Sequence, residues 1–282
     1  MQADVWLKAA IQQLHSVGIE TARLDALVLL EDYSGHDRGY LLAHPELAID
    51  EAVVRQLANV LKERAQHIPL AYLRGKAEFY GREFVVGPGV LVPRPETEAI
   101  IDLFNQLLNE LNGHQQSAPN GQQWRVADVG TGSGALGITA ALEQPSVHVS
   151  LLEIDTAAIQ IAKTNVINLS TATPVIESDL LENGAQDYDI LLCNLPYVPD
   201  DYVINQAATH EPALAIFGGA DGLDLYRRLF TQIKIVANKP LYILTEALPE
   251  SHELLATLAG ASGYQLMKTA DFVQLFAYQA AA

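Results

Sequence analysis

The chain has 282 residues, with 17 Lys and Arg against 34 Asp and Glu, so its formal net charge is −17. Hydrophobic residues make up 49% and charged residues 18%, which excludes an intrinsically disordered chain. The acid excess repels phosphate backbones and argues against direct nucleic-acid binding. A single cysteine, Cys193, excludes a disulfide framework and a multi-cysteine zinc site, and we expect no metal.

The apolar stretches of the sequence are short. The longest unbroken ones, such as residues 26–30, fall far below the roughly 20 residues of a membrane span. The first residues include an early acid and lack the basic-then-apolar order of a signal peptide. We therefore expect a soluble, cytoplasmic protein with no membrane partner.

Residues 1–72 show only helical periodicity. Apolar residues recur at three- and four-residue steps from Val5 to Val17, and Gly18 follows as a stop. Thr21, Asp37 and Asp50 precede three further helical patterns, where each is a candidate N-cap. The pattern predicts a small helical bundle without a catalytic cluster.

Residues 73–94 differ in character and predict a β-hairpin connector. Segments 78–86 and 90–92 are strand-like and are interrupted by glycine and proline. Pro95 then opens a helix that runs to about Leu111. The polar stretch 112–123 predicts a loop.

From Trp124 onward, strand and helix patterns alternate. Strands are expected at 125–129, 147–152, 174–176, 188–193 and 241–245, and helices at 135–142, 157–168 and 223–237. Nearly continuous apolar strands between amphipathic helices indicate an α/β fold with a parallel sheet covered on both faces. The final strands, 264–268 and 272–278, have no helix between them, so one of them is expected to be antiparallel. We take residues 95–282 as one domain.

The strongest local motif is VADVGTGSGALG at 126–137. Gly130, Gly132 and Gly134 stand between a strand and a helix, where glycine lets the backbone approach a ligand at a helix N-terminus. The spacing differs from the dinucleotide fingerprint and lacks the Gly-Lys-Ser/Thr ending of a P-loop. Taken alone, the motif is also compatible with an ordinary tight turn.

Acidic residues follow the next two strands. Glu153 comes directly after an apolar strand, where a carboxylate can accept both hydroxyls of a ribose; the alternative is a solvated loop acid. Asp155 is interpreted as a helix cap. Asp179 lies at the same carboxyl edge, where it could reach an adenine amino group or act as a turn residue.

A polar tetrapeptide, Asn194-Leu195-Pro196-Tyr197, follows the strand that ends at Cys193. At the carboxyl edge of an α/β sheet, the Asn194 amide can accept and donate hydrogen bonds. Pro196 stiffens the turn, and Tyr197 offers a flat face for a planar group. The arrangement suits a planar amide or an exocyclic amine, although an ordinary Asn/Pro turn is the alternative.

Together these motifs resemble the class I S-adenosylmethionine-dependent methyltransferases, and most closely the HemK/PrmC family of protein-(glutamine N5) methyltransferases that act on peptide chain release factors. The resemblance covers nearly the whole chain and rests on four segments: 68–86, VLVPRPETE at 90–98, ADVGTGSG at 127–134, and 211–229 after the tetrapeptide. It implies a Rossmann-like domain, S-adenosyl-L-methionine (AdoMet) as cofactor, and a release factor as the protein partner. The bundle at 1–72 would then be a substrate-recognition domain.

The resemblance also implies roles for individual residues. Residues Gly130, Thr131, Gly132, Ser133 and Gly134 would face the methionine part of the cofactor, and Glu153 would hold the ribose. Asp179 and Leu180 would lie at the adenine. Asn194 would bind the substrate glutamine and adjoin the cofactor, with Leu195 contributing its carbonyl and Pro196 and Tyr197 shaping the pocket.

One position departs from the family pattern. The family usually reads NPPY, whereas this chain reads NLPY, which resembles the tetrapeptide of adenine dimethylases acting on ribosomal RNA. Two alternatives to glutamine methylation therefore stay open: an adenine-N6 methyltransferase on RNA or DNA, and a non-catalytic AdoMet-binding docking protein. Arg94, Glu96 and Glu98 are interpreted as an ion pair plus acids at a helix N-terminus, or as residues that shape the access of a peptide.

Overall fold

The computed structural model describes residues 1–114, 116, 118–119, 123–183 and 187–279. The chain forms two compact units. The first contains Met1–Lys76 together with Ile204–His210, and the second contains Ala77–Val203 and Glu211–Ala282. A segment that follows the tetrapeptide thus belongs to the helical unit; within it, His210 Nε2 lies 3.0 Å from the Gln66 carbonyl oxygen.

The first unit is helical, as the sequence predicts. Its helices are α1 (Ala3–Ser16), α2 (Ala22–Ser34), α3 (Arg38–Ala43), α4 (Glu51–Arg64) and α5 (Leu70–Arg74). The Asp37 carboxylate accepts from the Tyr40 N–H at 2.8 Å, and Asp50 accepts from the Ala52 N–H at 2.9 Å, which confirms both as caps. Thr21 occupies the N-cap position of α2, but its side chain makes no capping hydrogen bond.

Large apolar side chains from the longer helices form the core of this unit. They include Trp6, Leu14, Leu29, Leu30 and Leu57. One ion pair is buried among them, between Arg64 Nε and Asp25 Oδ2 at 2.7 Å. The pairing satisfies two charges that would otherwise be costly to bury.

A two-stranded hairpin follows. Strands β1 (Lys76–Phe79) and β2 (Arg82–Val85) pair with one another, and Tyr80 and Gly81 form the turn with φ of 51° and 70°. Two successive positive φ values suit the twist of a tight hairpin. The expected strand at 90–92 is wrong, because no strand forms there; Pro88, Gly89 and Pro93 interrupt the extended backbone.

The second unit contains a seven-stranded sheet in the order β5-β4-β3-β6-β7-β9-β8. Its strands are β3 (Arg125–Val129), β4 (His148–Glu153), β5 (Val175–Glu177), β6 (Ile190–Cys193), β7 (Tyr242–Glu246), β8 (Tyr264–Ala270) and β9 (Val273–Tyr278). Strands β3 to β7 pair in parallel, and β9 is antiparallel to both of its neighbours. The predicted mostly parallel sheet with an antiparallel C-terminal strand is confirmed.

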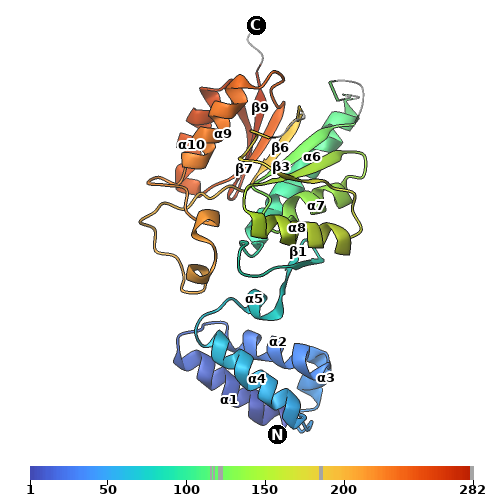
Figure 1. Ribbon diagram of the computed structural model, residues 1–282, viewed down its shortest axis with the longest axis vertical. Coiled ribbons are helices and arrows are strands. Elements are labelled where there is room, and N and C mark those ends of the chain that lie inside the picture. Colours follow the sequence, from blue (N-terminus) through green and yellow to red (C-terminus); the bar gives the residue numbers. More distant parts are fainter. Residues whose placement is uncertain (115, 117, 120–122, 184–186, 280–282) are drawn as a thin grey trace. The chain divides into compact units, whose positions relative to one another are not determined.

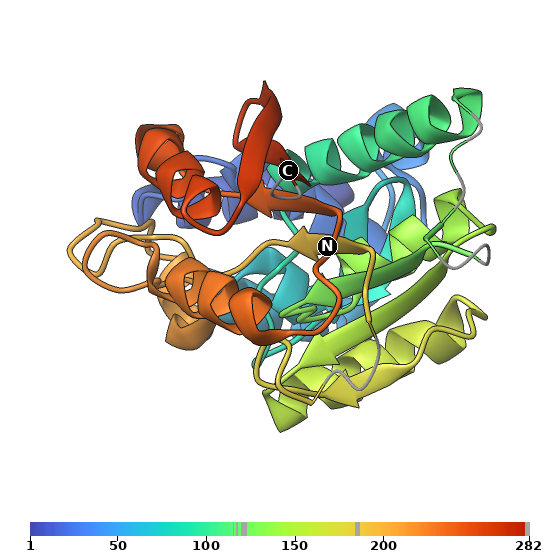
Figure 2. The same ribbon diagram turned by 90° about the horizontal axis from the view of Figure 1, so that it is seen from above.

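Helices cover both faces of this sheet (Figures 1 and 2). Helices α6 (Glu98–Gly113), α7 (Ala135–Glu143) and α8 (Thr156–Asn168) lie on one face, and α9 (Asp224–Ile235) and α10 (His252–Gly260) on the other. Alternate strand residues face the two layers: Val126 belongs to the first core cluster and Ala127 to the second. Both faces of the sheet carry apolar side chains, because helices cover both of them.

Two details of the expected helices differ. Pro95 opens a short 3-10 turn, Pro95–Thr97, before α6 begins at Glu98. Helix α6 continues to Gly113, so the expected loop at 112–123 begins later, and its positions 115, 117 and 120–122 lie outside the described residues.

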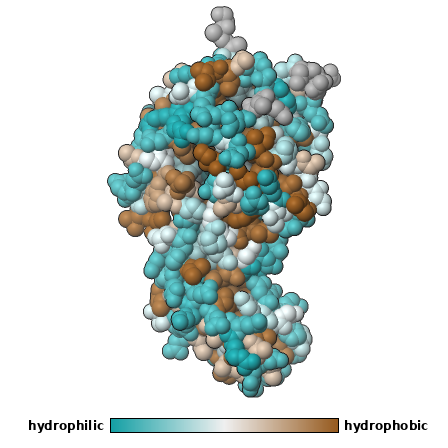
Figure 3. All heavy atoms as spheres, viewed as in Figure 1, coloured by the Kyte–Doolittle hydropathy of each residue, from teal (hydrophilic) through white to brown (hydrophobic). Residues whose placement is uncertain are grey.

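The surface drawn in Figure 3 is mainly hydrophilic, with hydrophobic residues in separate patches. Within the described part of the chain, no helix combines the length and apolar character needed to cross a membrane.

Candidate functional site

The glycine-rich loop after β3 turns sharply before α7 begins. Gly130, Gly132 and Gly134 have φ of 71°, 57° and 83°, a region that side chains rarely adopt. The Gly130 and Thr131 N–H groups donate to the Leu152 carbonyl oxygen at 2.9 and 3.0 Å. A Cβ at Gly132 would meet no atom within 4 Å, so a ligand can approach the loop backbone at that point.

Asp128, near the end of β3, joins this loop to the first turn of α7. Its carboxylate accepts hydrogen bonds from the Thr131 hydroxyl and, at 2.8 Å, from the Gly137 N–H. Burial raises the pKa of Asp128 to about 7, against the opposing effect of these two donors. A Cβ at Gly137 would lie 2.3 Å from Leu151 Cδ2, so α7 can pack this closely on the sheet only with glycine there.

Glu153 lies at the end of β4 and is only 8% exposed, so it is not a solvated loop acid. Its Oε2 accepts from the Gly132 N–H at 2.8 Å, and its Oε1 accepts from the N–H groups of Ile154 and Asp155 at 2.9 Å. One carboxylate thus orders both the glycine-rich loop and the turn into α8. Asp155 caps α8 as predicted, accepting from the Ala157 N–H at 2.8 Å.

Asp179 and Leu180 follow β5 and line the same cavity as Glu153. Asp179 Oδ2 pairs with Arg228 of α9 at 2.6 Å. The other carboxylate oxygen, Oδ1, takes no part in this ion pair. Leu180 has a positive φ of 53°, and the Ser178 hydroxyl donates to its carbonyl oxygen at 2.8 Å. The turn therefore directs one acidic and one apolar side chain toward the same space.

The tetrapeptide projects from the carboxyl end of β6. Asn194, Leu195 and Pro196 line the cavity, and the Asn194 Nδ2 donates to Thr97 Oγ1 at 2.8 Å. Tyr197 is not one of the described residues that line it. The Tyr197 hydroxyl instead donates to Glu246 Oε1 at 2.8 Å, and burial raises its pKa.

A second loop packs directly on the backbone of the tetrapeptide. A Cβ at Gly218 would lie 2.4 Å from the Pro196 carbonyl oxygen, and one at Gly222 would lie 2.1 Å from the Tyr197 carbonyl oxygen. The Gly218 N–H also donates to the Val198 carbonyl oxygen at 2.9 Å. These two glycines thus determine where the tetrapeptide backbone can lie, a role that their sequence positions do not suggest.

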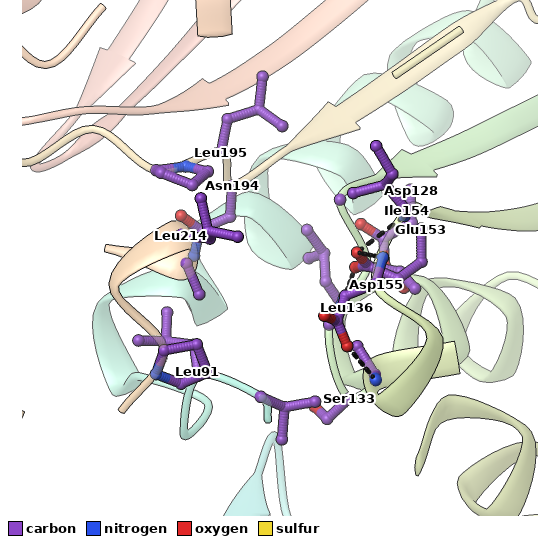
Figure 4. Close-up of a pocket in the computed structure, with 18 of the residues that line it drawn as sticks. Leu91, Asp128, Ser133, Leu136, Glu153, Ile154, Asp155, Asn194, Leu195 and Leu214 are labelled. Atoms are coloured by element: carbon purple, nitrogen blue, oxygen red, sulfur yellow. Dashed lines mark hydrogen bonds between the residues drawn. The ribbon is translucent and has the colours of Figure 1, made fainter. Parts of the chain in front are cut away.

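These elements enclose one cavity of about 450 Å³, a size typical of cofactor sites. Of the residues predicted from the sequence, the cavity is lined by Gly130, Thr131, Gly132, Ser133, Glu153, Asp179, Leu180, Asn194, Leu195 and Pro196. Gly134 does not line it; a Cβ there would lie 2.9 Å from Ile138 Cδ1 in the core. Figure 4 shows Asn194 and Leu195 on one side of the opening and Glu153 and Ile154 on the other.

Sequence reasoning missed several residues of this wall: Phe79, Leu91, Pro93, Thr97, Leu136, Ile154, Leu214 and Arg228. Ile154 could have been found, because it directly follows Glu153. Arg94 pairs with the buried Glu211 at 2.6 Å, which confirms an ion pair, and it also lines the cavity. Its role in the access of a peptide stays a prediction.

The cavity fits an adenosine-containing cofactor with an extended polar tail. Glu153 supplies carboxylate oxygens, Ile154 and Leu180 supply apolar surface, and the loop glycines allow close approach of the backbone. The tetrapeptide lies in the same cavity, so a group held by Asn194 would be close to a molecule bound along the loop.

Two family models match the chain: the PrmC N-terminal domain at residues 5–75 and the methyltransferase small domain at residues 105–267. The release factor glutamine methyltransferase of Koribacter versatilis is 36% identical over 231 residues, covering 80% of this chain and 79% of that protein. The Bacillus subtilis protein of the same name is 32% identical over 246 residues, covering 85% and 83%.

Other relatives are longer or more distant. A bifunctional methyltransferase of Rickettsia bellii is 32% identical over 244 residues, which cover 79% of this chain but 44% of that protein. The crystal structure of the hMettl16 catalytic domain with MAT2A 3'UTR hairpin 1 superposes with a TM-score of 0.51 at 15% identity, covering 96% of this chain and 91% of that one. This last similarity concerns the fold alone.

Proposed function

The chain belongs to the release factor glutamine methyltransferase family, and on this premise we propose that it methylates the side-chain amide nitrogen, N5, of a glutamine in a peptide chain release factor. The methyl donor is S-adenosyl-L-methionine and the second product is S-adenosyl-L-homocysteine. One observation carries the proposal: Asn194 lies in the wall of the cofactor-sized cavity and donates from its Nδ2 to Thr97, while none of the described residues donates a hydrogen bond to its oxygen.

The glycine-rich loop and the ends of β4 and β5 hold the cofactor in this proposal. Residues 130–133 lie along its methionine part, Glu153 accepts from the ribose hydroxyls, and Asp179 accepts from the adenine amino group. Ile154 and Leu180 contact the adenine faces. When bound, AdoMet supplies a sulfonium methyl group that a correctly aligned nucleophile can take.

The tetrapeptide orients the substrate amide. An amide nitrogen is a poor nucleophile, because its lone pair is delocalised into the carbonyl. The Asn194 side-chain oxygen and the Leu195 carbonyl oxygen accept its two N–H groups and direct the lone pair toward the methyl group. These contacts strengthen as the nitrogen becomes positive, so they stabilise the transition state more than the bound substrate.

No strong base is required before transfer. The N-methylated amide is acidic once the new bond has formed and loses its proton readily. Orientation supplies much of the acceleration, since a near-attack geometry contributes about 7–11 kcal/mol. Pro196 limits the backbone freedom of the turn. The Tyr197 hydroxyl stabilises the turn by donating a hydrogen bond to Glu246.

We also propose a separate role for each segment of the chain. Residues 1–72 recognise the release factor, residues 95–282 carry out the transfer, and residues 73–94 link these two segments of the chain. Since release factors terminate translation on ribosomes, the enzyme would work in the cytoplasm, with a protein and not a nucleic acid as its direct partner.

Transfer of labelled methyl from AdoMet to a purified release factor tests this function. We expect label on the native factor and none on a factor whose target glutamine is alanine. Asn194→Ala should bind AdoMet as the native enzyme does but lower the transfer rate by about 10²-fold. Absence of label with cofactor binding intact would overturn the release factor assignment, and structured RNA would then be tested as the acceptor.

A further inference from the structure

Leu180 has a backbone conformation that is unusual for a leucine. Its φ of 53° lies in the left-handed region, which residues other than glycine, asparagine and aspartate rarely adopt. It follows Asp179, whose carbonyl oxygen closes a turn by accepting from the Glu182 N–H at 3.1 Å. A glycine would adopt this conformation without strain, but it would lack the side chain that lines the cavity. A leucine at this position therefore needs support from the surrounding fold.

Gln232 of α9 provides this support with both ends of its carboxamide. Its Oε1 accepts from the Leu181 N–H at 2.8 Å, and its Nε2 donates to the Asp179 carbonyl oxygen at 3.2 Å. These two backbone groups belong to the two peptide planes on either side of Leu180. Because peptide groups are planar, φ and ψ of Leu180 are the only soft rotations between those planes. A single side chain that bonds to both planes therefore restrains the conformation of Leu180.

Other contacts hold separate parts of the same turn. The Ser178 hydroxyl donates to the Leu180 carbonyl oxygen at 2.8 Å. Arg228, one helical turn before Gln232 on α9, pairs with Asp179 Oδ2 at 2.6 Å. Each of these contacts holds one group of the turn, whereas Gln232 bonds to the peptide groups before and after Leu180.

Gln232 acts on the cavity through the turn. The described residues that line the cavity include Asp179 and Leu180 but not Gln232. Leu180 is 7% exposed and belongs to the same core cluster as Leu229 and Ile233 of α9. The turn and the helix therefore share one packed core, and a change at Gln232 reaches a bound cofactor only by moving the turn.

We propose that Gln232 is a positioning residue of the cofactor site: it holds Leu180 in the left-handed conformation and thereby places the Leu180 side chain and the Asp179 carboxylate against the adenine. The consequence is a preference for a purine with an amino group at position 6, which donates to Asp179, over a purine with an oxygen there. The place of the adenine rests on the proposed function, whereas the restraint on Leu180 does not.

The restraint on Leu180 is tested without any ligand. Leu180→Gly and Leu180→Ala both remove the side chain, but only glycine adopts a positive φ freely. From urea unfolding, we expect the folding equilibrium constant of Leu180→Gly to be about fivefold larger than that of Leu180→Ala. With Gln232→Ala added to both variants, the ratio should fall to about one or below, because residue 180 can then leave the left-handed region. An unchanged ratio would overturn the restraint.

The preference for the base is tested with S-adenosyl-L-homocysteine and S-inosyl-L-homocysteine, which has an oxygen in place of the adenine amino group. In calorimetric titrations, the native enzyme should bind the adenosyl compound about tenfold more tightly, because one hydrogen bond to a carboxylate is lost with the inosyl compound. Gln232→Ala should reduce this preference to about twofold. A general loss of stability would weaken the binding of both compounds equally and leave the ratio of their Kd values unchanged.

The matched control is Gln160→Ala. It makes the same change of side chain within a helix, at an exposed position of α8. Added to the two Leu180 variants, it should leave the ratio of their folding constants unchanged. It should also leave the ratio of the two Kd values as in the native enzyme.

The outcomes separate this inference from the proposed function. If the native enzyme prefers the adenosyl compound and Gln232→Ala keeps the full preference, the inference is wrong and the proposed place of the adenine stands. If the native enzyme does not distinguish the two compounds, the proposed place of the adenine fails, and the comparison of the Leu180 variants alone decides the restraint. Neither experiment uses a release factor, so a failure of methyl transfer changes neither result.

Discussion

Asn165 of α8 forms with Val85 of β2 the pair of hydrogen bonds that a neighbouring strand would make. Its Oδ1 accepts from the Val85 N–H at 2.7 Å, and its Nδ2 donates to the Val85 carbonyl oxygen at 2.9 Å. The same Nδ2 donates to the Ser133 carbonyl oxygen at 2.8 Å. A single buried amide therefore joins the hairpin, α8 and the glycine-rich loop.

Replacing Asn165 should weaken AdoMet binding, because the glycine-rich loop then loses a hydrogen bond at Ser133. Asn165→Ala removes the partner of the Val85 N–H, the Val85 carbonyl and the buried Ser133 carbonyl. We therefore expect the free energy of unfolding to fall by about 2–4 kcal/mol and the Kd for AdoMet to rise about tenfold. Urea unfolding and calorimetric titration measure the two effects. Asn168→Ala, at an exposed position of the same helix, should change neither; a native Kd in Asn165→Ala would contradict the proposed support of the loop.

The packing of Gly218 on the tetrapeptide predicts a selective loss of catalysis. Gly218→Ala places a methyl group 2.4 Å from the Pro196 carbonyl oxygen, so one of the two backbones must move. We expect methyl transfer to fall by about 10²-fold, because small misplacements of oriented groups are costly, while AdoMet still binds. Gly260→Ala is the control, since a Cβ there meets nothing within 4 Å. Full activity in Gly218→Ala would show that the tetrapeptide tolerates displacement.

Leu195 departs from the family pattern, and its side chain is part of the core. It is 2% exposed, and its Cδ2 would lie 3.1 Å from a Cβ at Gly130. Leu195→Pro and Leu195→Ala should each lower the free energy of unfolding by about 3 kcal/mol, yet both keep the carbonyl group and should retain transfer. If Leu195→Pro alone were inactive, the backbone N–H or the φ freedom of residue 195 would be required.

Asp128 makes the stability of the fold depend on pH. Its pKa is about 7 in the folded protein, because of burial, against a usual value of 3.8. The folded state thus binds the proton more tightly, and the stability that this provides is lost as the pH rises from about 4 to 7, by about 4 kcal/mol in total. Asp128→Asn keeps an acceptor for Thr131 and Gly137 but cannot titrate.

Urea unfolding of the native protein and of Asp128→Asn across pH 4–8 measures the contribution of Asp128 to stability. The stability of the native protein relative to Asp128→Asn should decline with rising pH and level off above about pH 7. Two parallel pH profiles would show that Asp128 does not titrate in this range.

Much of the architecture follows from the amino-acid sequence itself. The alternation of apolar strands and amphipathic helices from Trp124 onward predicts the parallel sheet, because hydrophobic periodicity is a local property of the chain. Positions directly after such strands meet at one edge of the sheet. For this reason Glu153, Asp179 and Asn194 could be assigned to the same cavity without coordinates.

Only the tertiary structure decided how those side chains are used. Tyr197 donates to Glu246 and does not line the cavity, Asn194 donates to Thr97, and Asn165 donates to the Ser133 carbonyl of the glycine-rich loop. The partners of Asn194 and Tyr197 are 97 and 49 residues away in the chain. No local pattern encodes such a pairing, because the direction of a buried polar group is determined by whichever donors and acceptors the fold brings beside it.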